Sequence, residues 1–152
     1  MSSHQGSGND TPVERVSQLV EHHARGEKPR DQWKIGTEHE KFAFSRALDP
    51  LAYEGSIADS KAPGIKQVLE AFRDQFGWHE QIDQGQLIAL LSEEGSIALE
   101  PGGQVELSGQ ARATIHETRV ELDRHVDELR ALTRTLGVRW MWVGAQPVHQ
   151  PA

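Results

Sequence analysis

The chain has 152 residues and contains no cysteine. Its length fits one domain or part of a larger protein, and the lack of thiols excludes a disulfide framework, a thiolate metal site and a cysteine nucleophile. With 16 lysine and arginine residues against 23 aspartate and glutamate residues, the net charge is −7, which argues against a nucleic-acid groove or an anionic membrane surface as the main partner. No apolar run approaches the roughly 20 residues of a membrane helix, and no secretory signal is present. We therefore expect a cytoplasmic protein.

The N-terminal segment predicts a tail followed by one helix. Residues 1–10 are rich in serine, glycine and other polar residues and have little to bury, so we expect them to be disordered. Thr11 is suited to cap a helix that has Pro12 in its first turn, and Gly26 is suited to end that helix. One face of the helix is apolar and consists of Val13, Val16, Leu19 and Val20.

A strand, a loop and a second helix are expected next. Aromatic residues and isoleucine alternate with polar residues over Trp33–Phe44, which predicts a strand. Turn-forming residues in Ser45–Ala62 predict a loop. Apolar residues then recur at helical spacing as far as Gly77, a residue type that commonly ends a helix. These apolar residues are Ile65, Val68, Leu69, Phe72 and Phe76.

The middle of the chain predicts two β-hairpins. Short runs rich in aliphatic residues are separated by turn signals at Gln84-Gly85 and at Pro101–Gly103. The expected strands are Trp78–Asp83, Gln86–Ser92, Ser96–Glu100 and Gln104–Ser108.

A long amphipathic helix and a last strand follow the hairpins. The helix is expected over Ala111–Leu136 with Gly137 at its end, its charged residues facing solvent and His116 and His125 at the surface or in packing contacts. Val138–Ala145 is apolar enough for a buried final strand. The expected apolar stripe of the helix consists of Ile115, Leu122, Val126, Leu129, Leu132 and Leu136.

The order of these elements favours an α+β fold with a mainly antiparallel sheet and flanking helices. A buried final strand needs a neighbour on each side, and the sequence ends soon after this one. We therefore expect residues 11–147 to form the N-terminal part of a larger domain and residues 148–152 to be its truncated end.

Two glutamates lie close together in the first expected strand. In the segment GTEHEKF, which begins at Gly36, Glu38 and Glu40 project from one face because side chains alternate along a strand, and His39 points the other way. Two carboxylates one pleat apart repel each other unless a cation lies between them, and Mg²⁺ prefers oxygen ligands of this kind. The alternative is an exposed acidic pair on an edge strand, without a ligand.

The second hairpin carries another acidic group. If Pro101–Gly103 forms the turn, Glu100 lies opposite Gln104, and Glu106 shares their face at a diagonal of roughly 7–8 Å from Glu100. The aliphatic residues of the two strands then cover the other face. The alternative interpretation is a solvated polar face, with the two glycines needed only for the turn.

The two acidic groups together favour a metal site. Four glutamates on neighbouring strands would repel one another strongly without bound cations. The sequence contains neither a P-loop nor the glycine-rich dinucleotide-binding fingerprint. We therefore expect Mg²⁺ ions on these glutamates to hold the phosphates of a nucleotide directly.

Several segments resemble the glutamate–cysteine ligases of the plant and proteobacterial type. They include WKIGTEHEKF (33–42), FGW (76–78) and, above all, LEPGGQVELSG (99–109), in which the string EPGGQVELSG is highly specific. The similarity extends from about Trp33 to Pro147, which is nearly all of the chain after the N-terminal helix.

This resemblance implies a glutamine-synthetase-like catalytic domain that joins the γ-carboxyl of glutamate to the amine of cysteine at the expense of ATP, the first step of glutathione synthesis. It implies that Gln104 and Tyr53 lie at the substrates and that Glu38 and Glu106 are catalytic. The magnesium ligands that it implies are Glu38, Glu40, Glu100 and Glu106. The expected partners are the small molecules glutamate, cysteine and ATP, and neither nucleic acid nor a membrane.

Members of this family run on for several hundred residues, so the resemblance covers about their N-terminal third. Two alternatives remain open. One is a related ligase that uses another amine acceptor. The other is a non-catalytic binding domain that keeps only the acidic sheet.

Overall fold

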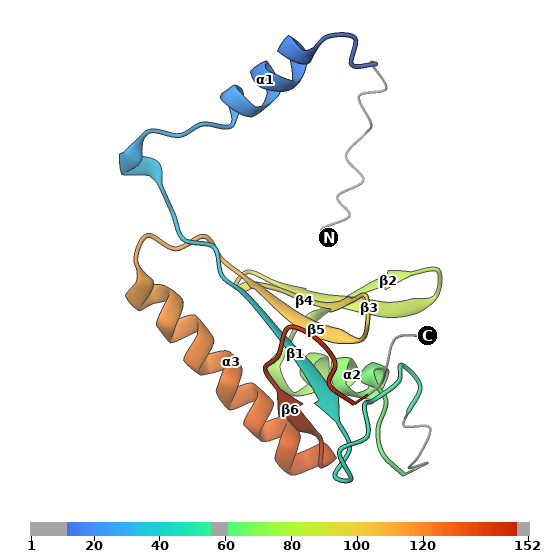
Figure 1. The fold of residues 1–152 in the computed structure, drawn as a ribbon. Helices are drawn as coiled ribbons and strands as arrows, with labels where there is room; N and C mark the ends of the chain where they lie inside the picture. Colours follow the sequence, from blue (N-terminus) through green and yellow to red (C-terminus); the bar gives the residue numbers. More distant parts are fainter. Residues whose placement is uncertain (1–11, 56–60, 149–152) are drawn as a thin grey trace. The chain divides into compact units, whose positions relative to one another are not determined.

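The computed structural model describes residues 12–55 and 61–148, which belong to two compact units with a boundary between Lys34 and Ile35. The first unit contains helix α1 (Val16–Arg25) and a short 3₁₀ helix (Arg30–Gln32) (Figure 1). The glycine predicted to end the first helix follows α1 directly. Thr11, the predicted cap, lies outside the described residues.

The second unit is built on one sheet of six strands in the order β2-β3-β4-β5-β1-β6, and every neighbouring pair is antiparallel. With its helices, this sheet confirms the predicted α+β class. The strands are β1 (Glu38–Phe44), β2 (His79–Asp83), β3 (Gln86–Ser92), β4 (Gly95–Glu100), β5 (Gln104–Gly109) and β6 (Arg139–Met141) (Figure 1).

Helices α2 (Ile65–Phe76) and α3 (Ile115–Leu136) pack against one face of this sheet and form the core with it. Gly77 and Gly137 follow these helices with φ values of 76° and 73°, a left-handed conformation that favours glycine, as the sequence predicted. None of the helices in the described part of the chain is long and apolar enough to cross a membrane. The central core residues include Val68, Leu69, Phe72, Leu90, Ile97, Val105, Leu107, Leu129 and Leu132.

The two predicted hairpins are confirmed, each strand within one residue of its expected bounds. In the turn between β4 and β5, Gly102 and Gly103 both have a φ of 85°, which a residue with a side chain rarely adopts. The backbone N–H of Gly103 donates to the carbonyl oxygen of Glu100 at 3.1 Å. The turn signals therefore determine how β4 pairs with β5.

The outer strands differ from the predictions. The strand predicted over Trp33–Phe44 begins only at Glu38, because the Trp33 indole donates to the Lys28 carbonyl at 2.8 Å and Ile35 makes only an isolated bridge. The predicted strand Val138–Ala145 was too long: β6 has three residues, and over residues 12–55 and 61–148 it pairs with β1.

Helix α3 buries only part of the predicted apolar stripe: Leu129 and Leu132 are buried as predicted, whereas the start of the helix differs. Ile115 and Val120, near its start, are 67% and 70% exposed, and polar residues face the sheet instead. Glu121 is buried because it accepts hydrogen bonds from the backbone N–H of Gln110 and the guanidinium of Arg112, both at 3.0 Å. The buried residues of α3 are Thr118, Glu121, His125, Leu129 and Leu132.

Candidate functional site

The register of three strands gathers the predicted acidic residues on one face of the sheet. Glu40 of β1 lies opposite Glu106 of β5, which in turn lies opposite Ala98 of β4. We call the nine positions of this part of the sheet the acidic face. They are Glu38, Glu40 and Phe42 of β1, Gln104, Glu106 and Ser108 of β5, and Ser96, Ala98 and Glu100 of β4.

Glu106 occupies the centre of the acidic face and is buried. Its carboxylate accepts a hydrogen bond from the hydroxyl of Ser108, two residues along the same strand. The side-chain amide of Gln104 donates to the carboxylate of Glu40 at 2.9 Å. Two neutral donors of β5 therefore orient two facing carboxylates, and each carboxylate keeps a second oxygen as a potential ligand.

Glu38 and Glu100 lie at opposite corners of the acidic face, two strands and four residues apart in register. Ordinary sheet spacings separate their Cα atoms by roughly 16 Å, so one ion cannot bind both. Glu38, Glu40 and Glu106 are neighbours, and Glu100 belongs to the other side of the face, beside Gln104.

The donors of the acidic face fit a magnesium ion by their chemistry, because all are oxygen atoms and most belong to carboxylates. Over residues 12–55 and 61–148, no three histidine or acidic side chains converge on a common point that could hold a metal ion. The four glutamates lie on one face of the sheet, as predicted. Their role as metal ligands stays a prediction.

Tyr53, predicted to contact a substrate, is not one of the nine positions. Its hydroxyl donates to the backbone carbonyl of Leu87 in β3 at 3.2 Å. This hydrogen bond ties the loop after β1 to the sheet, and the substrate contact of Tyr53 stays a prediction.

A cavity of about 460 Å³ lies elsewhere, beside α2 and α3, and contains none of the nine positions of the acidic face. Its lining residues are Phe76, Trp78, Ser92, Glu94, Arg124, Asp127 and Glu128.

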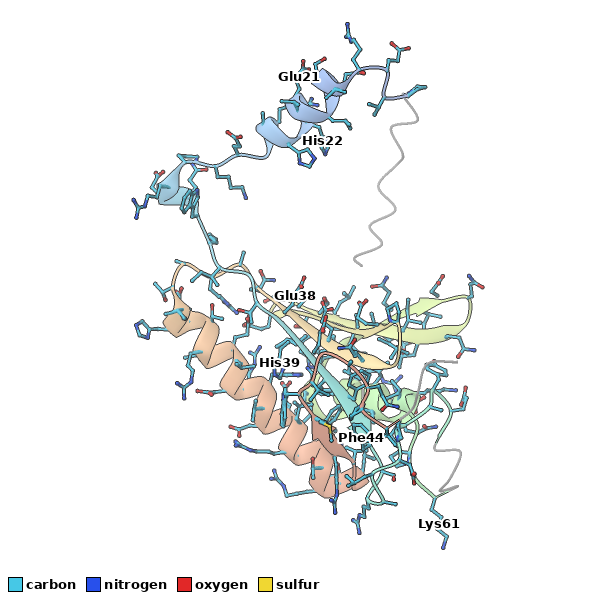
Figure 2. All side chains as sticks on the ribbon, in the orientation of Figure 1. Glu21, His22, Glu38, His39, Phe44 and Lys61 are labelled. Atoms are coloured by element: carbon cyan, nitrogen blue, oxygen red, sulfur yellow. The ribbon has the colours of Figure 1, made fainter. Side chains whose placement is uncertain are left out.

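A buried polar cluster that the sequence analysis missed lies on the other side of β1. Lys41 is 0% exposed and His125 of α3 is 2% exposed, and the Lys41 Nζ lies 2.6 Å from the His125 Nε2. The rings of His39 and His125 meet edge-on, with their centroids 5.9 Å apart. Figure 2 shows the side chains of His39 and Glu38 on β1. We call His39, Lys41, His125 and Glu128 the buried cluster.

Burial disfavours the charged forms in this cluster. It lowers the pKa of Lys41 to about 7, against the opposing effect of the Glu106 and Glu128 carboxylates. Burial and then the nearby Lys41 lower the pKa of His39 to about 4. Burial also lowers the pKa of His125, although the neighbouring Glu128 carboxylate opposes this effect.

Two signals in the sequence could have revealed the buried cluster. Lys41 alternates with Glu40 and therefore lies on the aliphatic face of the sheet, opposite Val105. His125 lies four residues before Leu129, on the same side of α3 as this core residue. The prediction that His39 points away from Glu38 and Glu40 is confirmed. The prediction that Glu121 and Glu128 face solvent is wrong, because both side chains are largely buried.

His125 should make the fold sensitive to acid. Because the pKa of His125 is lowered in the folded protein, the unfolded chain binds the proton more readily, and stability falls as the pH drops below the ordinary histidine pKa of about 6.5. We expect His125→Gln to reduce this loss, which is at most about 1.4 kcal/mol per pH unit for one proton. Urea unfolding between pH 8 and pH 5 measures it.

The matched control is His116→Gln, at an exposed histidine of the same helix, which should keep the pH dependence of the original protein. Equal pH slopes for the His125→Gln variant and the unchanged protein would contradict the assignment of this acid sensitivity to His125.

Comparison with known proteins now adds to this geometry. The family model described as glutamate-cysteine ligase family 2 matches residues 34–152, which include the whole acidic face. The chain belongs to this family of glutamate-cysteine ligases.

Three relatives show how far the similarity of this family member extends. The chain is 36% identical over 130 residues to the chloroplastic glutamate–cysteine ligase of Medicago truncatula, covering 85% of this chain and 24% of the relative. It is 35% identical over 130 residues to chloroplastic glutamate–cysteine ligase A of Oryza sativa subsp. japonica, covering 85% of this chain and 25% of the relative. It is 37% identical over 130 residues to the chloroplastic glutamate–cysteine ligase of Solanum lycopersicum, covering 85% of this chain and 23% of the relative.

The chain thus spans about a quarter of the length of the relatives it matches. The names of these glutamate–cysteine ligases also contradict the expected cytoplasmic location, because each of them is chloroplastic.

Proposed function

We propose that the complete protein is an ATP-dependent ligase that joins the γ-carboxyl of L-glutamate to the amine of L-cysteine through a γ-glutamyl phosphate, the first step of glutathione biosynthesis. The observation that carries this proposal is the acidic face itself. Its glutamates come from the two segments GTEHEKF and EPGGQVELSG, and the register pairs these segments side by side within the region that the family model matches.

Within this proposal, Glu38, Glu40 and Glu106 contribute ligands to one magnesium site and Glu100 contributes to another. The separation of Glu38 and Glu100 in the register supports this division of the ligands. Bound magnesium would neutralise the negative charge that develops on the phosphoryl group during its transfer from ATP.

The chain's own contribution is to hold negative charge in place before the substrates arrive. Gln104 and Ser108 orient the carboxylates of Glu40 and Glu106 by hydrogen bonds, on strands that are paired and packed. Donors and charges that are already oriented need not reorganise during the reaction, which is the main way in which a site of this kind lowers a barrier. In this scheme Gln104 and Tyr53 also contact the substrates.

We further propose that residues 11–147 are the N-terminal part of a glutamine-synthetase-like catalytic domain. An antiparallel sheet with carboxylates on one face and two helices on the other supports this assignment.

A ligase with another amine acceptor is the second candidate, because the acidic face contains features for handling phosphate but no feature specific to cysteine. Release of ADP by the complete gene product, measured with glutamate while the amine is varied, distinguishes the two. We expect turnover with cysteine to exceed turnover with alanine, glycine or 2-aminobutyrate by at least about tenfold, which corresponds to about 1.4 kcal/mol of discrimination.

Turnover that does not depend on cysteine would remove the specific assignment and favour the second candidate. Lack of ADP release with every amine would favour a non-catalytic binding domain.

A further inference from the structure

The acidic half of β1 has a strand neighbour on one side only. β5 pairs with Glu38–Phe42, whereas β6 pairs only with Phe42–Phe44. In the part of the chain that the structure describes, residues 38–41 therefore have no paired strand on the β6 side. One ladder of hydrogen bonds leaves this half of the strand freer to shift than a strand paired on both sides.

Lys41 attaches this half of β1 to α3. The Lys41 Nζ and the His125 Nε2 lie 2.6 Å apart and share a hydrogen bond, in which the donor depends on the protonation of the two groups. On its other side, the His125 Nδ1 lies 3.4 Å from the Glu128 Oε2, and neither of these two buried atoms makes a hydrogen bond within the described residues. The contact between β1 and α3 is therefore the one between Lys41 and His125.

His125 is itself held firmly, so it can serve as a fixed point. Its ring stacks on Phe72 of α2 with a centroid distance of 5.8 Å and an angle of 9° between the planes. The ring of His39 meets it edge-on from β1. Side chains from α2, α3 and β1 therefore meet at this one imidazole.

Stability alone gives little reason to keep a lysine here. Apolar residues of similar volume often replace buried charged pairs without loss of stability, whereas a buried polar contact can select one arrangement of the chain. Lys41 and Glu40 are adjacent and point to opposite faces, so any shift of β1 that breaks the Lys41 contact also moves Glu40 relative to Glu106.

We propose that Lys41 is a positioning residue, whose buried contact with His125 fixes the acidic half of β1 and so keeps Glu38 and Glu40 in place beside Glu106 for metal binding. The metal-binding part of this inference rests on the proposed function. The fixing of β1 does not, and it can be measured without any metal.

The test is Lys41→Met in the complete gene product, with Lys66→Met as the matched control. Methionine keeps the apolar stem of the lysine and removes its amine, whereas Lys66 is a partly exposed lysine of α2. We expect Lys41→Met to speed amide hydrogen exchange of residues 38–41 about tenfold in metal-free protein and to weaken Mn²⁺ binding, measured by calorimetry, about tenfold. The melting temperature should not fall, and Lys66→Met should change none of these.

A double variant, Lys41→Met with His125→Phe, guards against a misfolded single variant. It removes the donor and acceptor together and keeps a ring against Phe72, so it should fold and still bind Mn²⁺ weakly. A drop in melting temperature with faster exchange throughout the sheet in both variants would show a merely structural role and overturn the inference.

A parallel Mn²⁺ titration of the Glu106→Gln variant separates the two proposals. Weak binding by Glu106→Gln but unchanged binding and exchange in Lys41→Met would overturn the positioning role and leave the proposed metal site intact. Unchanged binding in both variants would overturn the metal site itself. If Lys41→Met then speeds amide exchange at residues 38–41 only, this result would still support the fixing of β1 by Lys41.

Discussion

Replacing Glu106 by glutamine should reduce magnesium-supported ADP release by roughly a thousandfold, the scale on which loss of one oriented charge-stabilising group acts. Glu106 lies at the centre of the acidic face and faces Glu40 directly. Glutamine keeps the size of the side chain and can still accept from Ser108, but it removes one negative charge from the proposed ligands. Steady-state ADP release by the complete gene product, with magnesium varied, measures the effect.

Glu93→Gln is the matched control, since Glu93 is an exposed glutamate in the turn between β3 and β4 and loses the same charge. We expect its turnover to be unchanged and both variants to unfold at the same temperature as the original protein. A Glu106→Gln variant with full turnover would contradict the metal role of this residue.

Replacing Phe72 by alanine should lower the free energy of unfolding by about 4 kcal/mol, the usual cost of emptying a fully buried aromatic site. Phe72 is completely buried in the core between α2 and the sheet, and it also supports the ring of His125. The variant should therefore lose both core packing and the support beneath the buried cluster. Chemical unfolding monitored by tryptophan fluorescence measures this loss.

Leu91→Ala is the control for Phe72→Ala, because Leu91 is a large apolar residue of β3 that is 44% exposed. Its substitution should cost less than about 1 kcal/mol. Equal losses for the two variants would show that the core does not depend on Phe72.

The elements that are marked by turn-forming or helix-ending residues could be predicted from the sequence. Each hairpin has a glycine in a left-handed conformation in its turn, and α2 ends at another such glycine. These signals act over a few residues. The length of the outer strands depends on distant partners instead. The Trp33 indole donates to the Lys28 carbonyl, and β6 pairs with β1 for three residues in the described part of the chain. Neither fact can be read from the local pattern.

The acidic face could be predicted because alternation and a known turn are enough to place side chains on a sheet. The buried cluster was missed, because a lysine and a histidine usually indicate solvent, although the positions of Lys41 on β1 and of His125 on α3 could have revealed it. Lys41 lies on the core face of the sheet, where its Nζ meets His125 of α3. The stripe predicted for α3 included Ile115, which is largely exposed, and left out His125, which is buried. The buried side of α3 was predicted from which residues are apolar, and the position of His125 on the helix was given too little weight.

The three-residue turn Pro101–Gly103 has a consequence for how the acidic face is encoded. Because side chains alternate sides at every residue, a slip of one residue in the pairing of β5 with β4 would turn the side chains of β5 to the opposite faces of the sheet. Glu106 would then point into the helical layer while Leu107 faced water. The turn that sets this register is accordingly as much a determinant of the chemistry as the carboxylates are.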